Sequence, residues 1–426
     1  MAGPPVSIAI QPPETAGASP QRTTKARPGH VPRGIVALAL VAPLLLFLLA
    51  TFVVPVAVLL ARSVDNREVG ELLTRTASAM REWDGAALPD EGVVAALATD
   101  LRAAPRDRVA TVARVLNGYR PGFRSLLIDS ARTFRQAPAT PSAAGGLAAL
   151  VERHPAWGDI ATWRALKRAL PTVTDHYLLA ALDLRRDDGG ALSPVPADSA
   201  IYRDVLARTF TVSLSVTVGC LLLGYPLAYL MCHASPRVSR VLLLMVLLPF
   251  WTSLLVRTAA WTVVLQDHGV VNGLLAWLGL VDPAHPLKLM YNRVGVLIAM
   301  IHILLPFMVL PLHGTMKTIP ASFRHAAASL GAPPWRAFVR VYLPLTLPGI
   351  AAGTLLVFML ALGYYITPAL VGGTDDQMLS HYIAYFANQV SNWGMAAALG
   401  TVLLAITVVL YAVFQRVAGV DRLRIG

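Results

Sequence analysis

The chain has 426 residues, of which 55% are hydrophobic and only 14% carry a charge. Soluble globular domains carry about 25% charged residues, so this composition excludes an ordinary soluble domain and indicates a membrane protein. The net charge of +12 does not indicate a nucleic-acid partner, because residues 62–204 hold 19 Lys/Arg against 18 Asp/Glu and the remaining excess, 17 against 6, flanks apolar runs.

The chain begins with a polar segment that leads into a long apolar run. Residues 1–33 are rich in Pro, Gly, Ser and Thr and contain four basic residues, which predicts a disordered basic tail on the cytoplasmic side. The apolar run at 34–61 is too long for the core of a cleaved signal peptide, and it predicts the first transmembrane helix.

Residues 62–204 are the charge-balanced part of the chain, and their apolar residues recur at helical spacing. Val93, Val94, Leu97 and Leu101 illustrate the pattern, which is typical of one buried helix face. We therefore expect a helical extracytoplasmic insertion of about 140 residues between the first two membrane spans, which is large enough to have its own core.

Five further apolar runs are long enough to cross the roughly 30 Å hydrocarbon layer. They lie at 209–231, 241–265, 294–312, 347–371 and 394–414. The sequence therefore predicts an all-α membrane protein with six transmembrane helices, in which 205–416 forms a five-helix core and 417–426 a cytoplasmic tail.

The short loops predict the orientation of these helices. The loops at 232–240 and 313–346 carry Lys or Arg and no acid, whereas 372–393 carries Asp375 and Asp376 and no Lys or Arg. Basic loops remain in the cytoplasm, so both termini of this multi-pass chain are predicted to be cytoplasmic.

The sequence contains no residue pattern typical of ATP binding, catalysis, metal binding, a disulfide or proton-coupled transport. The sequence contains no P-loop motif for ATP, no nucleophile paired with a base and no metal-binding cluster, so we expect no enzyme, no catalytic residue, no metal and no cofactor. The two cysteines, Cys220 and Cys232, are about 18 Å apart on one helix, too far for a disulfide. No Asp or Glu lies within the six runs, which disfavours a proton-coupled carrier.

The loop at 323–345 has the pattern of two short helices joined by a tight turn. Gly331 suits the left-handed position that ends the first helix, and Pro333 and Pro334 suit the first turn of the second. Pro344 and Pro348 are expected to end the second helix and to lead into the next span. Small residues at the tip would let another protein approach closely, and the alternative is an amphipathic loop that lies on the bilayer.

The same loop resembles the E-A-A-x-x-x-G motif of ABC importer permeases, in which it is the coupling helix that docks into the ATPase subunit. The residues that carry the resemblance are His325, Ala326, Ala327, Leu330, Gly331, Ala332, Phe338, Leu343 and Pro344. His325 stands where the family has its glutamate, so the resemblance does not extend to that carboxylate.

A wider resemblance runs from residue 202 to the C-terminus. The segments at 249–258, 304–312 and 362–373 are similar to permeases of the spermidine/putrescine type. That family implies an importer subunit in the bacterial cytoplasmic (inner) membrane, surrounded by membrane lipid. It also implies three protein partners, namely an ABC ATPase that hydrolyses ATP on a separate chain, a second related permease and an extracytoplasmic substrate-binding protein.

Six residues are candidates for the translocation path of a cationic solute: Trp251, Arg257, Trp261, Tyr364, Tyr365 and Asp375. Aromatic faces can contact an amine, and an outer acid can attract it. The simpler alternatives are an interfacial belt or core packing for the aromatic residues, and a solvated loop acid for Asp375. We favour a structural role for Arg257, since a fixed positive charge does not help a cation to pass.

The sequence thus predicts a permease subunit that moves a small polyamine-like solute by alternating access. The first alternative is the same role for another amine, an amino-acid derivative or an organophosphorus compound. The second is a membrane-anchored sensor or scaffold whose function lies in the segment at 62–204.

Overall fold

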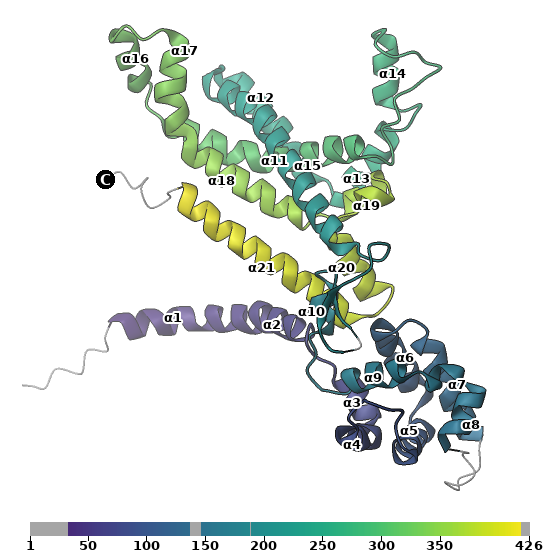
Figure 1. The fold of residues 1–426 in the computed structure, drawn as a ribbon. Coiled ribbons are helices and arrows are strands. Elements are labelled where there is room, and N and C mark those ends of the chain that lie inside the picture. The colour runs from purple at the N-terminus through teal and green to yellow at the C-terminus, as the bar shows by residue number, and fades with distance from the viewer. Residues whose placement is uncertain (1–32, 137–145, 188, 419–426) are drawn as a thin grey trace, which may run out of the picture. The chain divides into compact units, whose positions relative to one another are not determined.

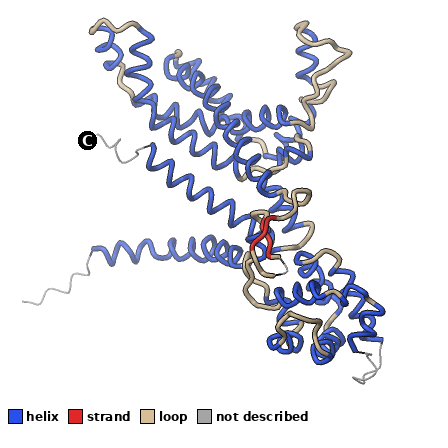
Figure 2. The backbone as a smooth tube through the Cα atoms, in the orientation of Figure 1, coloured by secondary structure: helices blue, strands red, loops and turns tan. Residues whose placement is uncertain are grey.

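The computed structural model describes residues 33–136, 146–187 and 189–418. The chain divides into two compact units, Met1–Val56 and Ala57–Gly426. The described residues are almost entirely helical, and their only strands form one short hairpin (Figures 1 and 2). This confirms the predicted all-α class. Of the tails expected at 1–33 and 417–426, residues 1–32 and 419–426 lie outside the described residues.

The first apolar run forms one membrane-length helix, Leu40–Ala61. It consists of α1 (Arg33–Leu48), the π-helical turn η1 (Leu49–Val53) and α2 (Val54–Ala61). The π turn ends two residues before Pro55, which has no N–H to donate to the carbonyl of Thr51. The helix therefore continues past the proline with a local change in its hydrogen-bond spacing.

A compact group of helices follows the first span. These helices are α3 (Arg67–Leu72), α4 (Thr74–Glu82), α5 (Glu91–Ala103), α6 (Arg106–Tyr119), α7 (Phe123–Gln136), α8 (Gly146–Arg153), η3 (Pro155–Gly158) and α9 (Ile160–Ala169). The apolar positions that define the sequence pattern, such as Leu97 and Leu101, are fully buried in a common core with Trp157 and Trp163. The helical insertion is thus confirmed, and its placement outside the membrane stays a prediction.

Two small elements connect this group to the second span. They are α10 (His176–Ala180) and an antiparallel hairpin of β1 (Leu184–Arg186) and β2 (Leu192–Pro194), in which Arg185 faces Ser193. The carboxylate of Asp183 then accepts hydrogen bonds from the backbone N–H groups of Tyr202 and Arg203, at 3.1 and 2.7 Å. An acid at this position stabilises the start of the next helix.

The remaining helices are those of the membrane core. They are α11 (Tyr202–His233), α12 (Pro236–Leu247), η4 (Leu248–Trp251), α13 (Leu254–Val264), α14 (Val270–Trp277), α15 (Arg293–Thr318), α16 (Ser322–Ser329), α17 (Pro334–Ala337), η5 (Phe338–Tyr342), α18 (Leu343–Leu362), α19 (Ile366–Val371), η6 (Thr374–Asp376), α20 (Leu379–Asn388) and α21 (Trp393–Ala418). Helices α11, α15 and α18 pack together at its centre (Figure 1).

Small residues make this packing close. A Cβ atom at Gly353 would lie 2.8 Å from the sulfur of Met308, and a Cβ atom at Gly224 would lie 3.0 Å from the Cγ of the same side chain. Met308 is fully buried between these two glycines of α18 and α11. Glycine therefore lets three long helices approach each other around one methionine.

The run at 241–265, which we expected to be one span, is broken in the structure. Helices α12 and α13 meet at 104°, so five helices of the described residues are long enough to cross a membrane by themselves, and six if this bent pair counts as one. The break follows from the sequence P-F-W-T-S. Pro249 lacks an N–H, and the Ser253 hydroxyl accepts a hydrogen bond from the N–H of Val256 at 3.2 Å, which caps a new helix.

The second helix of the 323–345 loop does not end at Pro344, and that prediction was wrong. Residues Pro334–Leu362 form one continuous helix of 29 residues. The π-helical turn η5 ends at Tyr342, two residues before Pro344. This wider turn accommodates the proline, which has no N–H to donate to the carbonyl of Arg340. The last part of the expected span at 347–371 is instead the separate helix α19.

Candidate functional site

The α16–α17 hairpin is exposed at its tip and anchored at its base. Gly331 has a φ of +78°, as the sequence predicts, and no atom lies within 4 Å of where its Cβ would be. Leu330 beside it is 88% exposed, whereas Ala327 and Ala337 are buried where the two helices touch. An exposed leucine next to a glycine forms a protruding surface that a partner can contact closely.

The other residues of the motif are likewise either exposed or partly buried in the hairpin. His325 and Ala326 are exposed, Ala332 and Leu343 are half-buried, and Pro344 is exposed. Phe338 is half-buried at the base of the hairpin. The structure thus places the predicted coupling residues along one hairpin, and their role in docking stays a prediction.

Aromatic rings hold the base of this hairpin, and of these only Phe338 was predicted as a motif residue from the sequence. Phe338 packs edge-on against Tyr225 and Tyr229 of α11, with ring centroids 6.2 and 5.7 Å apart, and lies against Tyr342 at 5.8 Å. The guanidinium of Arg324 lies over the ring of Tyr342. Edge-to-face pairs of this kind add to the packing energy. Movement of the hairpin is therefore linked to α11. The i, i+4 spacing of Tyr225 and Tyr229, and of Phe338 and Tyr342, was the available signal.

A second group of polar residues lies where two spans are broken. The hydroxyls of Thr258 on α13 and Thr367 on α19 are 3.2 Å apart, and the indole N–H of Trp261 donates to Nδ1 of His302 at 3.1 Å. Arg257 lies near enough for its charge to act on His302 and Tyr364. Three predicted path residues, Arg257, Trp261 and Tyr364, are thereby brought into one region.

The structure does not bring the other three path candidates into this group. Within the described residues, no hydrogen bond, ion pair or ring contact links Trp251, Tyr365 or Asp375 to it. Trp251 is 73% exposed and Tyr365 is 41% exposed. Asp375 is exposed, whereas its neighbour Asp376 is buried and pairs with Arg293 at 3.2 Å. The acid that stabilises the fold here is therefore Asp376.

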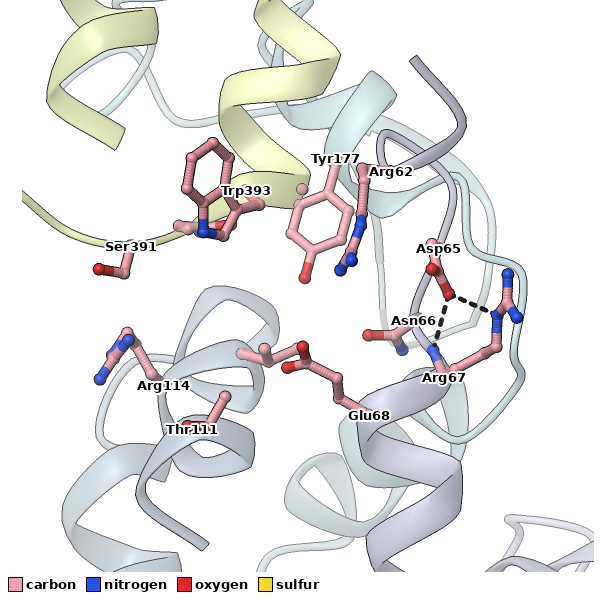
Figure 3. Close-up of a pocket in the computed structure, with 13 residues that line it drawn as sticks. Arg62, Asp65, Asn66, Arg67, Glu68, Thr111, Arg114, Tyr177, Ser391 and Trp393 are labelled. Carbon is pink, nitrogen blue, oxygen red and sulfur yellow. Dashed lines mark hydrogen bonds and ion pairs between the residues drawn. The ribbon is translucent and has the colours of Figure 1, made fainter. Parts of the chain in front are cut away.

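A charged cleft of about 250 Å³ lies between the insertion and the start of the last span (Figure 3). Arg62, Glu68 and Arg114 line it together with Trp393, while Tyr177 closes one side. Arg114 donates to the carbonyl of Val390 at 3.4 Å, which joins α6 to the loop before α21. Charges of both signs meet here without a geometry that indicates catalysis.

The packing beside this cleft is tight. A Cβ atom at Gly394 would lie 2.5 Å from the ring of Tyr177, so only glycine fits there without displacement. The adjacent His176 stacks on Tyr119 with ring centroids 3.9 Å apart. Burial lowers the pKa of His176 to about 4 and raises the pKa of Tyr119 to about 12. Both groups are neutral at pH 7, and they join the insertion to α10.

Metal ligands were not expected. Within the described ranges, no group of three or more His, Cys, Asp or Glu side chains is close enough to hold a metal ion.

Comparison with known proteins places residues 221–419 in the family described as "Binding-protein-dependent transport system inner membrane component". The chain is 33% identical over 216 residues to the spermidine/putrescine transport system permease protein PotB of Escherichia coli strain K12, covering 51% of this chain and 78% of that protein. It is 36% identical over 214 residues to PotB of Haemophilus influenzae, covering 50% and 74%.

Among solved structures, the chain is similar to the crystal structure of a bacterial alginate ABC transporter in complex with a periplasmic protein bound to alginate pentasaccharide. The sequence identity is 20%, the TM-score is 0.43, and the match covers 50% of this chain and 77% of that one. The relatives named above are transport components of the membrane and not enzymes. The chain therefore belongs to the family of binding-protein-dependent inner membrane components, the permease subunits of ABC importers.

Proposed function

We propose that this chain moves a polyamine-like solute across the bacterial inner membrane by alternating access, as one permease subunit of an ATP-driven importer. The observation that carries the proposal is the similarity to spermidine/putrescine permeases, which covers about three quarters of those proteins. The family match at 221–419 contains the broken span and the α16–α17 hairpin, and the insertion at 62–204 precedes it.

The hairpin is the proposed contact with the ATPase subunit. Its exposed tip around Leu330 and Gly331 can enter a groove of a partner, and its base is fixed to α11 through Phe338. A hairpin that is packed on α11 in this way would transmit a movement of the ATPase to the membrane helices, because packed helices shift as rigid units rather than deform. His325 is exposed at this surface in place of a glutamate, so the proposed docking of this chain uses no carboxylate at that position.

The remaining parts of the proposal concern assembly. A second, related permease completes the path, an extracytoplasmic binding protein delivers the solute, and membrane lipid surrounds the spans. Both termini are cytoplasmic, as the basic loops indicate, and the 62–204 insertion is then extracytoplasmic. The exposed apolar side chains of Leu40–Ala61 suit contact with lipid or with another span.

Uptake of a labelled polyamine tests the function. The chain is produced with its cognate ATPase, second permease and binding protein in cells that lack their own polyamine uptake. We expect accumulation of labelled spermidine or putrescine that requires ATP hydrolysis and is lost when this chain is omitted. If the purified binding protein ignores amines and binds another solute, the polyamine assignment fails and the importer role remains.

A further inference from the structure

The side chain of Arg257 has no counter-charge among the residues that the structure describes. It belongs to α13, the half-span that begins after the 104° bend. Its Nε atom is buried without a hydrogen-bond partner, and no ion pair joins its guanidinium to a carboxylate within the described residues. A guanidinium stays charged at any physiological pH, so the positive charge must be compensated by another group.

The four acids outside the insertion that lie in the described part of the chain do not supply this charge. Asp376 pairs with Arg293, and Asp282 pairs with His285. Asp267 and Asp375 are exposed and form no ion pair with Arg257. The titratable side chains on which Arg257 acts are His302 and Tyr364, neither of which is a carboxylate, and none of the six apolar runs contains an Asp or Glu.

The surface around Arg257 is also uncovered. Leu255 and Val256, the two residues that precede it in α13, are each 60% exposed, and Trp251, before the bend, is 73% exposed. The charge lies within the spanning region, since its neighbour His302 is nine residues, roughly 14 Å, from the Arg293 end of α15. Lipid tails can cover the apolar residues but cannot compensate a guanidinium at this depth.

We propose that the second permease subunit covers this face of α13 and supplies an Asp or Glu carboxylate that pairs with Arg257. Only a protein partner matches both properties of the surface, an apolar face and one isolated positive charge. The pair would also neutralise a charge that repels an amine in the path. This inference rests on the proposed function in assuming two permeases and a cationic solute.

Charge reversal across the two subunits tests the proposal. Arg257→Lys, Arg257→Gln and Arg257→Glu are made in the complete transporter, with Arg416→Gln in the exposed last turn of α21 as the control. The amount of second permease that co-purifies with this chain is measured beside uptake. We expect Gln and Glu to lower co-purification several-fold, Lys to retain most of it, and Arg416→Gln to change nothing.

The decisive step combines Arg257→Glu with changes in the second permease, whose Asp and Glu residues are replaced one at a time by Lys or Arg. One replacement should restore both co-purification and uptake. If none restores them, or if Arg257→Gln assembles and transports like the unchanged chain, the proposal is wrong. The proposal is also wrong if the Arg257 variants assemble normally with the second permease but change the uptake of an anionic solute. In that case the transported anion, and not the second permease, supplies the negative charge.

If the Arg257→Gln variant does not accumulate in the membrane, the same pairing can be tested from the other subunit. The chain is kept unchanged, and each carboxylate of the second permease is neutralised to Asn or Gln. One such change should reproduce the loss of assembly, and the absence of any effect contradicts the pairing. A complex that assembles through this pair but takes up no polyamine refutes the proposed solute alone.

Discussion

At the scale of single residues, backbone conformation decides the most specific position of the hairpin. Gly331 has a φ of +78°, which a residue with a Cβ adopts only at a cost of roughly 1 kcal/mol. The site around it is open, so the cost comes from the backbone and not from a clash. This distinction allows the turn and the contact surface to be tested separately.

Replacing Gly331 with Asp should abolish uptake while the protein inserts at normal levels. Aspartate adds a charge and a side chain at the exposed tip, where close approach of the ATPase is proposed. Co-purification of the ATPase and polyamine uptake are the measurements. Gly331→Asn is the control, because asparagine tolerates the left-handed conformation without a charge and should retain much of both. Full transport by Gly331→Asp would exclude the tip from the interface.

The exposed ring of Tyr365 should affect the rate of uptake more than the apparent affinity. An amine over a tyrosine face gains about 0.5–2 kcal/mol, which suits a weak contact along a path. Tyr365→Ala should lower the maximal rate several-fold, whereas Tyr365→Phe should be nearly silent because both rings present a π-face. Unaffected uptake by the double variant Tyr364→Ala/Tyr365→Ala would remove these rings from the path.

The buried His176 should make the insertion less stable in mild acid. Its pKa is about 4 in the fold and about 6.5 when exposed, so the unfolded state binds more protons between these values and stability falls as the pH drops. From pH 7 to pH 5 we expect a loss of about 1–2 kcal/mol, reduced because the residue keeps some contact with solvent. Thermal unfolding at both pH values measures it. His176→Phe, which keeps the stack on Tyr119, should lose this dependence.

At the scale of elements, the junction between α10 and α21 depends on one close contact. A Cβ at Gly394 would lie 2.5 Å from the ring of Tyr177, whereas nothing lies within 4 Å of a Cβ at Gly400 in the same helix. The two glycines therefore have different reasons to be there. The first permits packing, and the second only lowers helix propensity.

Gly394→Ala should destabilise the protein by about 1–3 kcal/mol, the usual range for overpacking a tight site. Gly400→Ala is the matched control, and it should be neutral or stabilising since alanine favours helix. The thermal midpoint of the purified complex measures both. Equal midpoints for the two variants would mean that the insertion is not held against α21 by this contact.

A proline within an apolar run breaks the helix at one place in this protein and not at another. Pro249 with Ser253 breaks one run into α12 and α13, while Pro344 leaves a helix intact because a π turn precedes it. Both segments are apolar runs with internal prolines. Which outcome occurs depends on whether a neighbouring residue caps a new helix, as Ser253 does, or the turn can widen.

At the scale of the whole molecule, the proposed orientation makes a direct prediction. A phosphatase reporter that folds only outside the cytoplasm, inserted at residue 141, should be active because 62–204 is proposed to be extracytoplasmic. A reporter that works only in the cytoplasm should be active after residue 424. The enzymatic activity of each fusion, corrected for its amount, is the measurement, and the opposite pattern would invert the topology.

The sequence alone determined the class of this protein. The features that indicate this class are local. Hydrophobic runs, the charges of short loops and the turn pattern at 323–345 each depend on residues that are close together in the chain. They were enough to predict most of the spans, the buried face of Leu97 and Leu101, and the turn at Gly331, but not the break within 241–265. The local pattern failed at Pro344, because a π turn depends on hydrogen bonds that periodicity does not show.

Only the tertiary structure decided which residues meet. Trp261 and His302 are 41 positions apart and Thr258 and Thr367 are 109 apart, so nothing in their sequence spacing relates them. The same holds for the unpaired charge of Arg257, since being unpaired is a property of everything around a residue. Such features arise from helices packed in three dimensions, where burial and charge compensation are set jointly by segments distant in the chain.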